Sequence, residues 1–334
     1  MSFDDAPPTI ALAIGDPAGI GPELAARTLV DPELADCARL VVVGDRRVLE
    51  LGARHADLEL DIPNASDLDA AARETGPAVM LDCVPADLDG VVLGQATRAG
   101  GASALGNFAA ALRLARDGLA DAVAFTPFNK QAMRLAWPAY VDETGYIAAV
   151  LGIDVEGREF NVLDEVWNAR VTSHVPLSQV AGLISEQRVL DSILFTDRVM
   201  RAAGIERPRL GVAALNPHAG DGGNFGTEDD AILVPAVAAA QARQVKVEGP
   251  IPSDTVFVRA TRGEFDAVVT MYHDQGQIAM KLLGFERGVT YLGGYPFPIT
   301  TPAHGSAYDI AGAGRAATGA TRNAIRLAAT LTRR

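Results

Sequence analysis

The sequence has little cysteine, few aromatic residues and no long hydrophobic run. Its 334 residues include only 2 cysteines, which suits a reducing compartment better than a disulfide scaffold. A membrane-spanning helix needs about 18 consecutive apolar residues, and no window of 18 uncharged apolar residues occurs. The first residues lack a basic stretch followed by an apolar one. We therefore expect no membrane partner, no secretory signal and a cytoplasmic location.

Positive charge is also scarce. The 29 Lys and Arg residues stand against 42 Asp and Glu, which gives a net charge of −13. An acidic surface repels phosphate backbones, so we expect no nucleic-acid partner. What the chain does have is 49% hydrophobic residues, 33 glycines and 19 prolines, the composition of a turn-rich globular protein. Its length predicts two domains or one large one, with a hydrophobic core that needs no disulfide bond or metal ion to stabilise it.

Short apolar runs alternate with amphipathic stretches along the chain. We expect strands at 9–15, 40–44, 78–84, 122–126, 159–163, 169–174, 210–215 and 267–271. We expect helices at 21–30, 97–116, 176–203, 228–243 and 318–332. Nearly continuous apolar strands followed by helices are typical of parallel sheets covered on both faces. The pattern therefore predicts an α/β fold built from βαβ units.

Five of the expected strands are followed by loops rich in Gly, Pro, His and Asn. These loops read DPAGIGPE, PFNK, HVPL, NPHAGDGG and YHDQG. Ligands bind at the carboxyl ends of strands in such sheets, so five loops of this kind predict a composite active site. The first loop lacks the third glycine of a dinucleotide fingerprint and the lysine of a P-loop. It is either a tight turn with backbone N–H groups facing a cleft or a purely structural turn.

Three of the five histidines directly follow separate expected strands. They are His174, His218 and His273. Imidazole is the commonest protein ligand for Zn²⁺ and related ions, and three histidines leave a position open for substrate or water. No local pair has the spacing of a helical metal motif, so such a site would be assembled from distant loops. The alternative is that each histidine is a hydrogen-bonded structural residue.

A loop of small residues, TPAHGSAYDIAG, spans residues 301–312. Small residues let the backbone approach a flat ligand, and Asp309 could accept hydrogen bonds from ribose hydroxyls. Alternatively, Ser306 or Asp309 caps a helix. Lys130 and Lys281 lie near strand-end loops, where a lysine of lowered pKa could act as a general acid or base. The alternative for both lysines is an ordinary solvated side chain.

Taken together, these motifs resemble one family. GDPAGIGPE, TPFNK, SHVPL, NPHAGDGG, GPIPSDTVF, YHDQG and TPAHGSAYDIAG occur in family order between about residues 9 and 315. They resemble the 4-hydroxythreonine-4-phosphate dehydrogenases of pyridoxal-phosphate biosynthesis and their paralogues. HGSAYDIAG also looks like the adenosine-binding loop of isocitrate and isopropylmalate dehydrogenases. The resemblance implies two α/β/α lobes with a central cleft: a cofactor-side lobe of 1–128 plus 266–334, and a lobe of 129–265 that contributes metal ligands and a dimer interface.

The resemblance also implies the chemistry. NAD⁺, or NADP⁺, would oxidise a secondary alcohol next to a carboxylate-bearing carbon, and decarboxylation would follow; the default substrate is 4-phosphohydroxy-L-threonine. One Zn²⁺, Mg²⁺, Mn²⁺ or Co²⁺ ion would bind the three histidines at a site shared across a homodimer. Lys281, which also contacts substrate, and Asp274 are the implied catalytic residues. The implied cofactor-binding residues are His304, Gly305, Ser306, Asp309 and Gly312, with Asp309 favouring NAD⁺ over NADP⁺.

Three departures from the family pattern concern the substrate. Residues 142–145 read Asp-Glu-Thr-Gly where the family has Gly-His-Thr-Glu, and Thr290 replaces an Asn. Ile299 stands at the phosphate-side Arg, which removes a contact worth about 1.5–3 kcal/mol per hydrogen bond. The expected substrate contacts are therefore Glu143, Thr144, Lys281, Thr290 and Ile299. Since Glu143 would also repel a phosphate, we hypothesise a paralogue with another substrate, such as a cis-dihydrodiol carboxylate or a sugar acid.

Two other classes of protein are alternatives to a dehydrogenase. One is a non-enzymatic, two-lobed ligand-binding protein, in which the three strand-end histidines have no obvious purpose. The other is a phosphoryl or acyl transferase that uses the glycine-rich turn. The absence of a P-loop lysine and of a G-x-S-x-G nucleophile elbow disfavours it.

Overall fold

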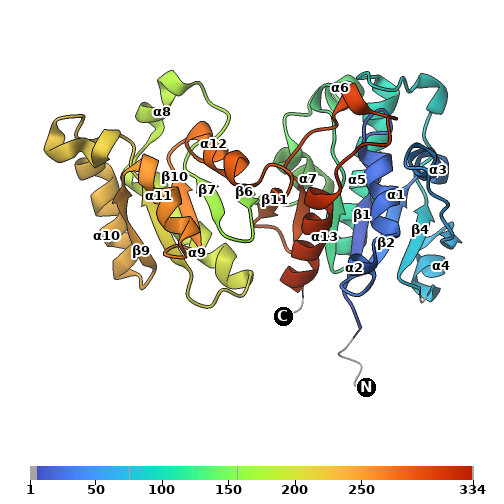
Figure 1. Ribbon diagram of the computed structural model, residues 1–334, viewed down its shortest axis with the longest axis horizontal. Coiled ribbons are helices and arrows are strands. Elements are labelled where there is room, and N and C mark those ends of the chain that lie inside the picture. The colour runs from blue at the N-terminus through green and yellow to red at the C-terminus, as the bar shows by residue number, and fades with distance from the viewer. Residues whose placement is uncertain (1–5, 75, 156, 333–334) are drawn as a thin grey trace. The chain divides into compact units, whose positions relative to one another are not determined.

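The computed structural model describes residues 6–332 except 75 and 156, and it divides into two units (Figure 1). Unit 1 contains the described residues up to 158 and those from 289 onward, and unit 2 contains residues 159–288. The expected second lobe, 129–265, begins and ends earlier. The difference arises because the two helices between residues 130 and 151 pack on a long helix of unit 1. Each unit is a sheet with helices, so the predicted α/β fold is confirmed.

Unit 1 is built on a largely parallel sheet. Its strands are β1 Thr9–Ala13, β2 Arg39–Gly44, β3 Asn64–Ala65, β4 Ala78–Asp82, β5 Ala122–Phe125, β11 Val289–Gly293 and β12 Ile299–Pro302. They lie in the order β3-β4-β2-β1-β5-β12-β11. Among the described strand pairs of unit 1, β11 and β12 are antiparallel and the others are parallel. Its helices are α1 Gly21–Leu29, α2 Pro32–Ala35, α3 Arg46–His55, α4 Leu68–Arg73, α5 Arg98–Arg116, α6 Lys130–Ala136, α7 Glu143–Leu151 and α13 Gly319–Thr332.

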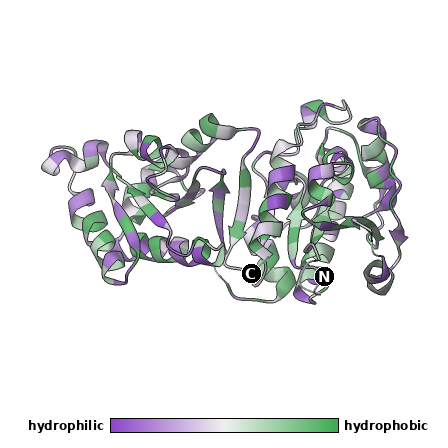
Figure 2. Cartoon of the chain, turned by 60° about the horizontal axis from the view of Figure 1, so that its bottom comes forward, coloured by the Kyte–Doolittle hydropathy of each residue, from purple (hydrophilic) through white to green (hydrophobic). Residues whose placement is uncertain are grey.

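The central strand β1 is buried on both faces, which explains its unbroken apolar sequence. Ile10 and Leu12 belong to one core cluster with residues of α1, α3 and α13. Ala11 and Ala13 belong to another cluster with residues of α5 and α7. Successive side chains of a strand point to opposite faces, so helices on both sides require apolar residues at every position. Figure 2 shows hydrophobic strands beside helices that carry hydrophilic residues.

Unit 2 has a smaller sheet. Its strands are β6 Arg158–Val162, β7 Trp167–Arg170, β8 Arg209–Ala213, β9 Lys246–Ile251 and β10 Ala267–Thr270, in the order β6-β7-β10-β8-β9. Of the pairs that the structure describes within unit 2, β6 and β7 are antiparallel and the others are parallel. The helices are α8 Leu177–Leu183, α9 Glu186–Ala202, α10 Val234–Ala242, α11 Ser253–Thr261 and α12 His273–Gly284. One core lies between the sheet and α11 and α12, and α9 packs on β7 and β10.

The sequence predicts strands better than helices. All eight expected strands are present, with ends that differ by a few residues. The expected helix 176–203 is divided into α8 and α9, because Ser185 caps the start of α9 by accepting a hydrogen bond from the Arg188 N–H. The expected helix 228–243 begins with a π-helical turn, η3 Asp229–Leu233, before α10. Among the described residues, no helix is long and apolar enough to cross a membrane.

Candidate functional site

Three loops of unit 1 meet where β1 and β5 end. The Asp16 N–H donates a hydrogen bond to the Pro127 carbonyl at 3.3 Å, which joins the β1–α1 loop to the loop after β5. The Ile20 N–H donates to the Ser306 carbonyl at 3.0 Å, which joins the β1–α1 loop to the expected cofactor loop. A Cβ on Gly19 would lie 2.8 Å from Ser306, so this close approach requires glycine. The GDPAGIG segment is therefore a tight turn seated against the expected cofactor loop.

A buried carboxyl group joins two of these loops, the β1–α1 loop and the expected cofactor loop. Asp16 is fully buried and accepts hydrogen bonds from the Ala18 N–H at 2.9 Å and the Tyr308 hydroxyl at 2.5 Å. Burial raises the pKa of Asp16, and burial together with the hydrogen bond to Asp16 raises the pKa of Tyr308. The sequence motifs did not predict this pair. The signal for it was an acidic residue directly after a fully apolar strand.

The expected cofactor residues lie on one irregular loop, and they differ in exposure. Ser306 is buried, whereas Gly305 and Asp309 are exposed. His304 is half-buried, and burial lowers the pKa of its imidazole. Gly312 has a φ of 76°, in the left-handed region that favours glycine. The short helical turn η4 Tyr308–Ile310 has no side-chain cap, so the interpretation of Ser306 or Asp309 as its cap is wrong.

The expected substrate contact Glu143 begins α7 and forms an ion pair. Its carboxylate lies 3.1 Å from the Lys130 ammonium, and the Glu143 side chain is only 13% exposed. The negative charge of Glu143 also adds to burial in raising the pKa of the neighbouring Tyr140 phenol. Because Lys130 offsets this charge, Glu143 repels an anion less than an unpaired carboxylate would.

The other expected substrate contacts have different surroundings. The Thr144 hydroxyl donates to Asp142 at 2.8 Å, and its carbonyl accepts from the Tyr295 hydroxyl at 3.2 Å. Thr290 lies on β11 opposite Thr301 and is partly exposed. Ile299 is fully buried in the core of unit 1, so its side chain has no exposed surface for a ligand.

Two of the three expected metal ligands lie side by side in unit 2. His174 follows β7, His273 begins α12, and their ring centroids are 5.6 Å apart. Two imidazoles on one tetrahedral ion have centroids roughly 5 Å apart, given metal–nitrogen distances of about 2.0–2.1 Å. His218 lies in the turn η2 Pro217–Gly223 after β8, with its ring 6.0 Å from that of Phe225. In the described part of the chain, no three His, Cys, Asp or Glu side chains are grouped to hold a metal ion.

Asp274 orients one of these histidines. Its carboxylate lies 2.6 Å from Nδ1 of His273, which leaves Nε2 of the ring available. Such a partner on the second nitrogen is the usual environment of a metal-binding histidine. Lys281 is exposed on the last turn of α12. Gln275, another residue overlooked in the sequence, donates to the Ala214 carbonyl at 2.7 Å and so joins α12 to the end of β8.

The backbone around two of the histidines is strained. His174 and His218 have φ angles of 52° and 53°, and Ala219 and Asp221 in the same turn have 53° and 46°. Residues other than glycine rarely adopt this region, and each such residue costs on the order of 1–3 kcal/mol. Strain of this kind concentrates at functional sites, which favours a binding role for these loops.

The fold defines an α/β protein whose candidate site residues lie in loops at the ends of its strands. The chain belongs to the PdxA family, because the family model described as "Pyridoxal phosphate biosynthetic protein PdxA" matches residues 36–328. This confirms the family that the motifs indicated.

Two relatives and one solved structure give the range of names among similar proteins. The chain is 55% identical over 98% of its length, and 94% of the relative, to "Putative 4-hydroxythreonine-4-phosphate dehydrogenase 2" of Rhizobium meliloti. It is 36% identical over 97% of both chains to "Putative D-threonate 4-phosphate dehydrogenase" of Symbiobacterium thermophilum. A terephthalate 1,2-cis-dihydrodiol dehydrogenase structure from Burkholderia xenovorans is 28% identical, with a TM-score of 0.66 over 97% of this chain and 98% of the other.

Proposed function

We propose that this PdxA-family dehydrogenase uses NAD⁺ to oxidise a secondary alcohol next to a carboxylate-bearing carbon, and that decarboxylation follows. The observation that carries the proposal is the loop of residues 303–312, which rests on the tight turn after β1 and exposes Gly305 and Asp309. An exposed carboxylate beside backbone of small residues suits a ribose with two hydroxyls and repels a 2′-phosphate. NAD⁺ is therefore the expected cofactor, and NADP⁺ the weaker one.

A divalent ion fits the paired histidines. His174 and His273 have the ring separation expected of two ligands, and Asp274 orients His273. When bound, the ion would stabilise negative charge on the substrate's hydroxyl oxygen. Asp274 is on this view a positioning residue, and Lys281 is the proposed general acid or base. Eight helical residues rise about 12 Å, so a substrate near His273 must extend along α12 to reach Lys281.

The third ligand, His218, would come from a second copy of the chain. One stripe of α12 and the residue after it is apolar and exposed: Ile278 is 61%, Leu282 84% and Phe285 59% exposed. Residues spaced by four and three lie on one side of a helix, so these side chains form a continuous surface, called here the α12 stripe. Burying the α12 stripe against a second copy would remove apolar area from water next to His273. We therefore propose a homodimer with a shared metal site.

Three compounds are candidates for the substrate. 4-Phosphohydroxy-L-threonine is the default, because it matches the name of the most similar relative reported above. D-Threonate 4-phosphate, a sugar-acid phosphate, and a cis-dihydrodiol carboxylate match the names of the other two proteins. Ile299 is buried in the core and gives no argument for either kind of substrate, and the Lys130–Glu143 ion pair weakens one argument against phosphate. All three candidates have a secondary alcohol near a carboxylate.

The test is an assay of NADH formation with each of these three substrates. The purified chain is loaded in turn with Zn²⁺, Mg²⁺, Mn²⁺ or Co²⁺, and NADP⁺ is compared with NAD⁺. We expect one substrate to be turned over at ordinary enzyme efficiency, with a loss of at least about 100-fold in His174→Ala. Efficient turnover of 4-phosphohydroxy-L-threonine would disprove the altered-substrate hypothesis. No NADH with any combination, in a protein that also binds no divalent ion, would instead support a ligand-binding protein.

A further inference from the structure

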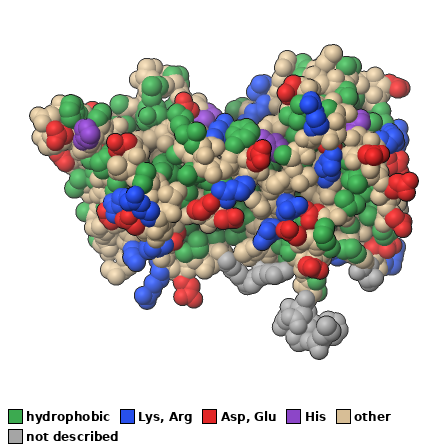
Figure 3. Space-filling view, in the orientation of Figure 1, with side chains coloured by type: hydrophobic (Ala, Val, Ile, Leu, Met, Phe, Trp, Pro, Cys, Tyr) green, Lys and Arg blue, Asp and Glu red, His purple; other side chains and the backbone are tan. Residues whose placement is uncertain are grey.

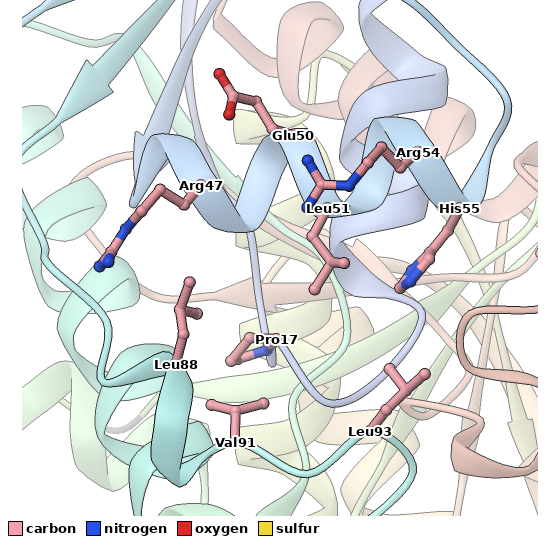
Figure 4. A pocket seen from close by; sticks show the side chains of 9 residues that line it. All are labelled: Pro17, Arg47, Glu50, Leu51, Arg54, His55, Leu88, Val91 and Leu93. Carbon is pink, nitrogen blue, oxygen red and sulfur yellow. The ribbon is translucent and has the colours of Figure 1, made fainter.

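Unit 1 contains a pocket that the proposed function does not use. It has a volume of about 480 Å³ and is lined by residues of three segments. These are α3, the turn after β1, and the segment formed by η1 Leu88–Gly90 and the residues that follow it. A pocket of this size can enclose a small metabolite. The lining residues are Pro17, Arg47, Glu50, Leu51, Arg54, His55, Leu88, Val91 and Leu93 (Figure 4).

The floor of the pocket is apolar. In Figure 4, Leu51 points from α3 toward Pro17, and Val91 lies on the opposite side of Pro17. Leu93 is 44% exposed and lines the cavity, so it offers apolar surface to an occupant. Removing such a surface from water by a bound apolar group is favourable, at about 25 cal/mol per Å². The floor therefore suits an aromatic or branched hydrocarbon body.

The charged groups at the two ends of the pocket differ in what they already bind. Arg47 forms an ion pair with buried Asp45, with 2.6 Å between Nη2 and Oδ2. Glu50 pairs with Arg46 at 2.9 Å, and its carboxylate points away from the pocket in Figure 4. Both of these charges are therefore compensated. The Arg47 end of the pocket offers little to an additional anion.

Arg54 is different. Its guanidinium makes no hydrogen bond or ion pair with any residue that the structure describes, and it lies beside Leu51 in Figure 4. The same is true of the imidazole of His55, the next residue and the last of α3. A guanidinium without a partner at the rim of an apolar cavity is suited to a carboxylate or phosphate, with which it can form two parallel hydrogen bonds.

We propose that this pocket binds a small amphipathic anion, with its carboxylate or phosphate on Arg54 and its aromatic or branched body on Leu51, Pro17 and Leu93. The site differs from the histidine pair, which belongs to unit 2. It also differs from the 303–312 loop, none of whose residues line it. The ligand class follows from the compensated charges at one end and the uncompensated guanidinium at the other.

The pocket touches the expected cofactor loop through two of its lining residues. A Cβ on Gly312 would lie 2.6 Å from Cδ2 of Leu93 and 3.5 Å from the His55 ring. A Cβ on Gly314 would lie 2.5 Å from the His55 carbonyl oxygen. The end of that loop thus rests on the side chains that an occupant would contact. We infer that an anion bound in the pocket changes the affinity for NAD⁺. This coupling rests on the proposed function, but the proposal that the pocket binds an anion does not.

The test measures binding directly, by calorimetry on the full chain without substrate. The probes are benzoate and phenyl phosphate, with benzamide as the neutral analogue of benzoate and inorganic phosphate as the anion without an apolar body. We expect both amphipathic anions to bind at least about tenfold more tightly than benzamide or inorganic phosphate. Arg54→Gln should weaken binding of benzoate by about tenfold or more, and Val91→Trp, which fills the pocket, should abolish it.

Arg262→Gln is the matched control. Arg262 is also an exposed arginine at the end of a helix, α11, and its guanidinium has no hydrogen-bond or ion-pair partner among the residues that the structure describes. It should leave benzoate binding unchanged, and unfolding midpoints of both arginine variants should be equal. Equal affinities of benzoate and benzamide, or unchanged binding in Arg54→Gln and Val91→Trp, would overturn the proposal.

The coupling is tested by titrating NAD⁺ at several fixed benzoate concentrations. Coupled sites shift the affinity for NAD⁺ to a plateau, typically about fivefold or more. A shift that grows without limit would mean that the two ligands exclude one another, so that the pocket is part of the dinucleotide's own site and the proposal of a separate site fails. If benzoate binds as expected while NAD⁺ does not bind at all, the proposed function fails and the pocket proposal stands.

Discussion

At the scale of single residues, two buried ionisable side chains, Asp16 and Arg170, join separate segments of the chain. The Asp16 carboxyl joins two loops, and Arg170 joins two strands: the Arg170 side chain is 2% exposed and pairs with Glu159 at 2.9 Å and with the Asn161 amide oxygen at 2.7 Å. A buried ionic group is costly unless its hydrogen bonds are complete. Substituting each of these side chains or its partner should therefore change the free energy of unfolding.

The titration of Asp16 makes stability depend on pH. Burial raises the pKa of Asp16 in the folded chain above its unfolded value, so its contribution to stability is full at low pH and is lost as pH rises through the folded pKa. Asp16→Asn removes this titration. We expect the stability of the variant, relative to the native chain, to increase between pH 4 and pH 7 in urea unfolding followed by circular dichroism.

Two further variants check the assignment to Asp16. Tyr308→Phe removes a hydrogen bond to the ionised carboxylate and should cost about 1.5–3 kcal/mol at neutral pH, and less at acid pH. Asp61→Asn, at an exposed loop position, should leave the pH dependence as it is. A parallel pH profile for Asp16→Asn and the native chain would contradict the prediction.

Removing the partner of Arg170 should destabilise unit 2. Glu159→Gln leaves a guanidinium buried without its counter-charge, in surroundings that already lower the pKa of Arg170 through desolvation. Breaking a buried ion pair in this way costs about 3–5 kcal/mol, and partial exposure of Glu159 places the expectation near the lower figure. Denaturant unfolding measures the loss. In the exposed pair Arg116–Asp117, the matched variant Asp117→Asn should cause no measurable change, and equal losses in both would refute the argument.

At the scale of elements, close contacts between helices depend on glycine. A Cβ on Gly52 of α3 would lie 2.1 Å from the Pro22 carbonyl oxygen of α1, which is a backbone atom that cannot turn aside. Gly52→Ala should therefore force the two helices apart and cost about 1–3 kcal/mol, although alanine is the better helix former. Thermal unfolding followed by circular dichroism measures this loss.

Gly182 of α8 is the control for that prediction. A Cβ there would meet nothing within 4 Å, so Gly182→Ala has only the gain in helix propensity, about 0.5–1 kcal/mol. The two variants make the same chemical change in a helix and should shift the unfolding temperature in opposite directions. A stabilised Gly52→Ala variant would show that α1 and α3 can separate without cost.

Elements were predictable from sequence where burial determines their pattern. Strands buried on both faces, such as β1 and β10, have nearly unbroken apolar sequences. β11 and β12 were overlooked because their antiparallel pairing mixes Thr with apolar residues, and α12 because Gly276 interrupts it. The position needs glycine because a Cβ on residue 276 would lie 2.1 Å from the Asn168 side chain. No local sequence pattern reveals this tertiary contact.

The candidate site was predictable only in part, for a related reason. The motifs located the loops and the family, since residue types directly after a strand are a local property. The Asp16–Tyr308 hydrogen bond and the Lys130–Glu143 ion pair join residues far apart in the chain or on different elements. Such pairings depend on how the loops fold over one another. Ile299 shows the limit most clearly, because an alignment to a family motif says nothing about the core in which its side chain is buried.

At the scale of the whole molecule, the surface charge and the α12 stripe bear on assembly. The face drawn in Figure 3 carries acidic and basic side chains in close alternation, without a large region of one sign. Long-range charge therefore does not select a partner on that face. The α12 stripe offers a hydrophobic contact instead, and it lies on the helix that begins with His273. Dimerisation and metal binding are thus expected to be coupled.

The double variant Ile278→Asp/Leu282→Asp tests this coupling. It places two charges on the α12 stripe and leaves all three histidines intact, so we expect a monomer in analytical ultracentrifugation and a loss of at least tenfold in Zn²⁺ affinity by calorimetry. Val258→Asp, at a position of α11 that is 47% exposed, should keep both the dimer and the affinity. A monomeric variant with undiminished Zn²⁺ affinity would place the complete metal site within one chain, and a variant that stays dimeric would place the interface elsewhere.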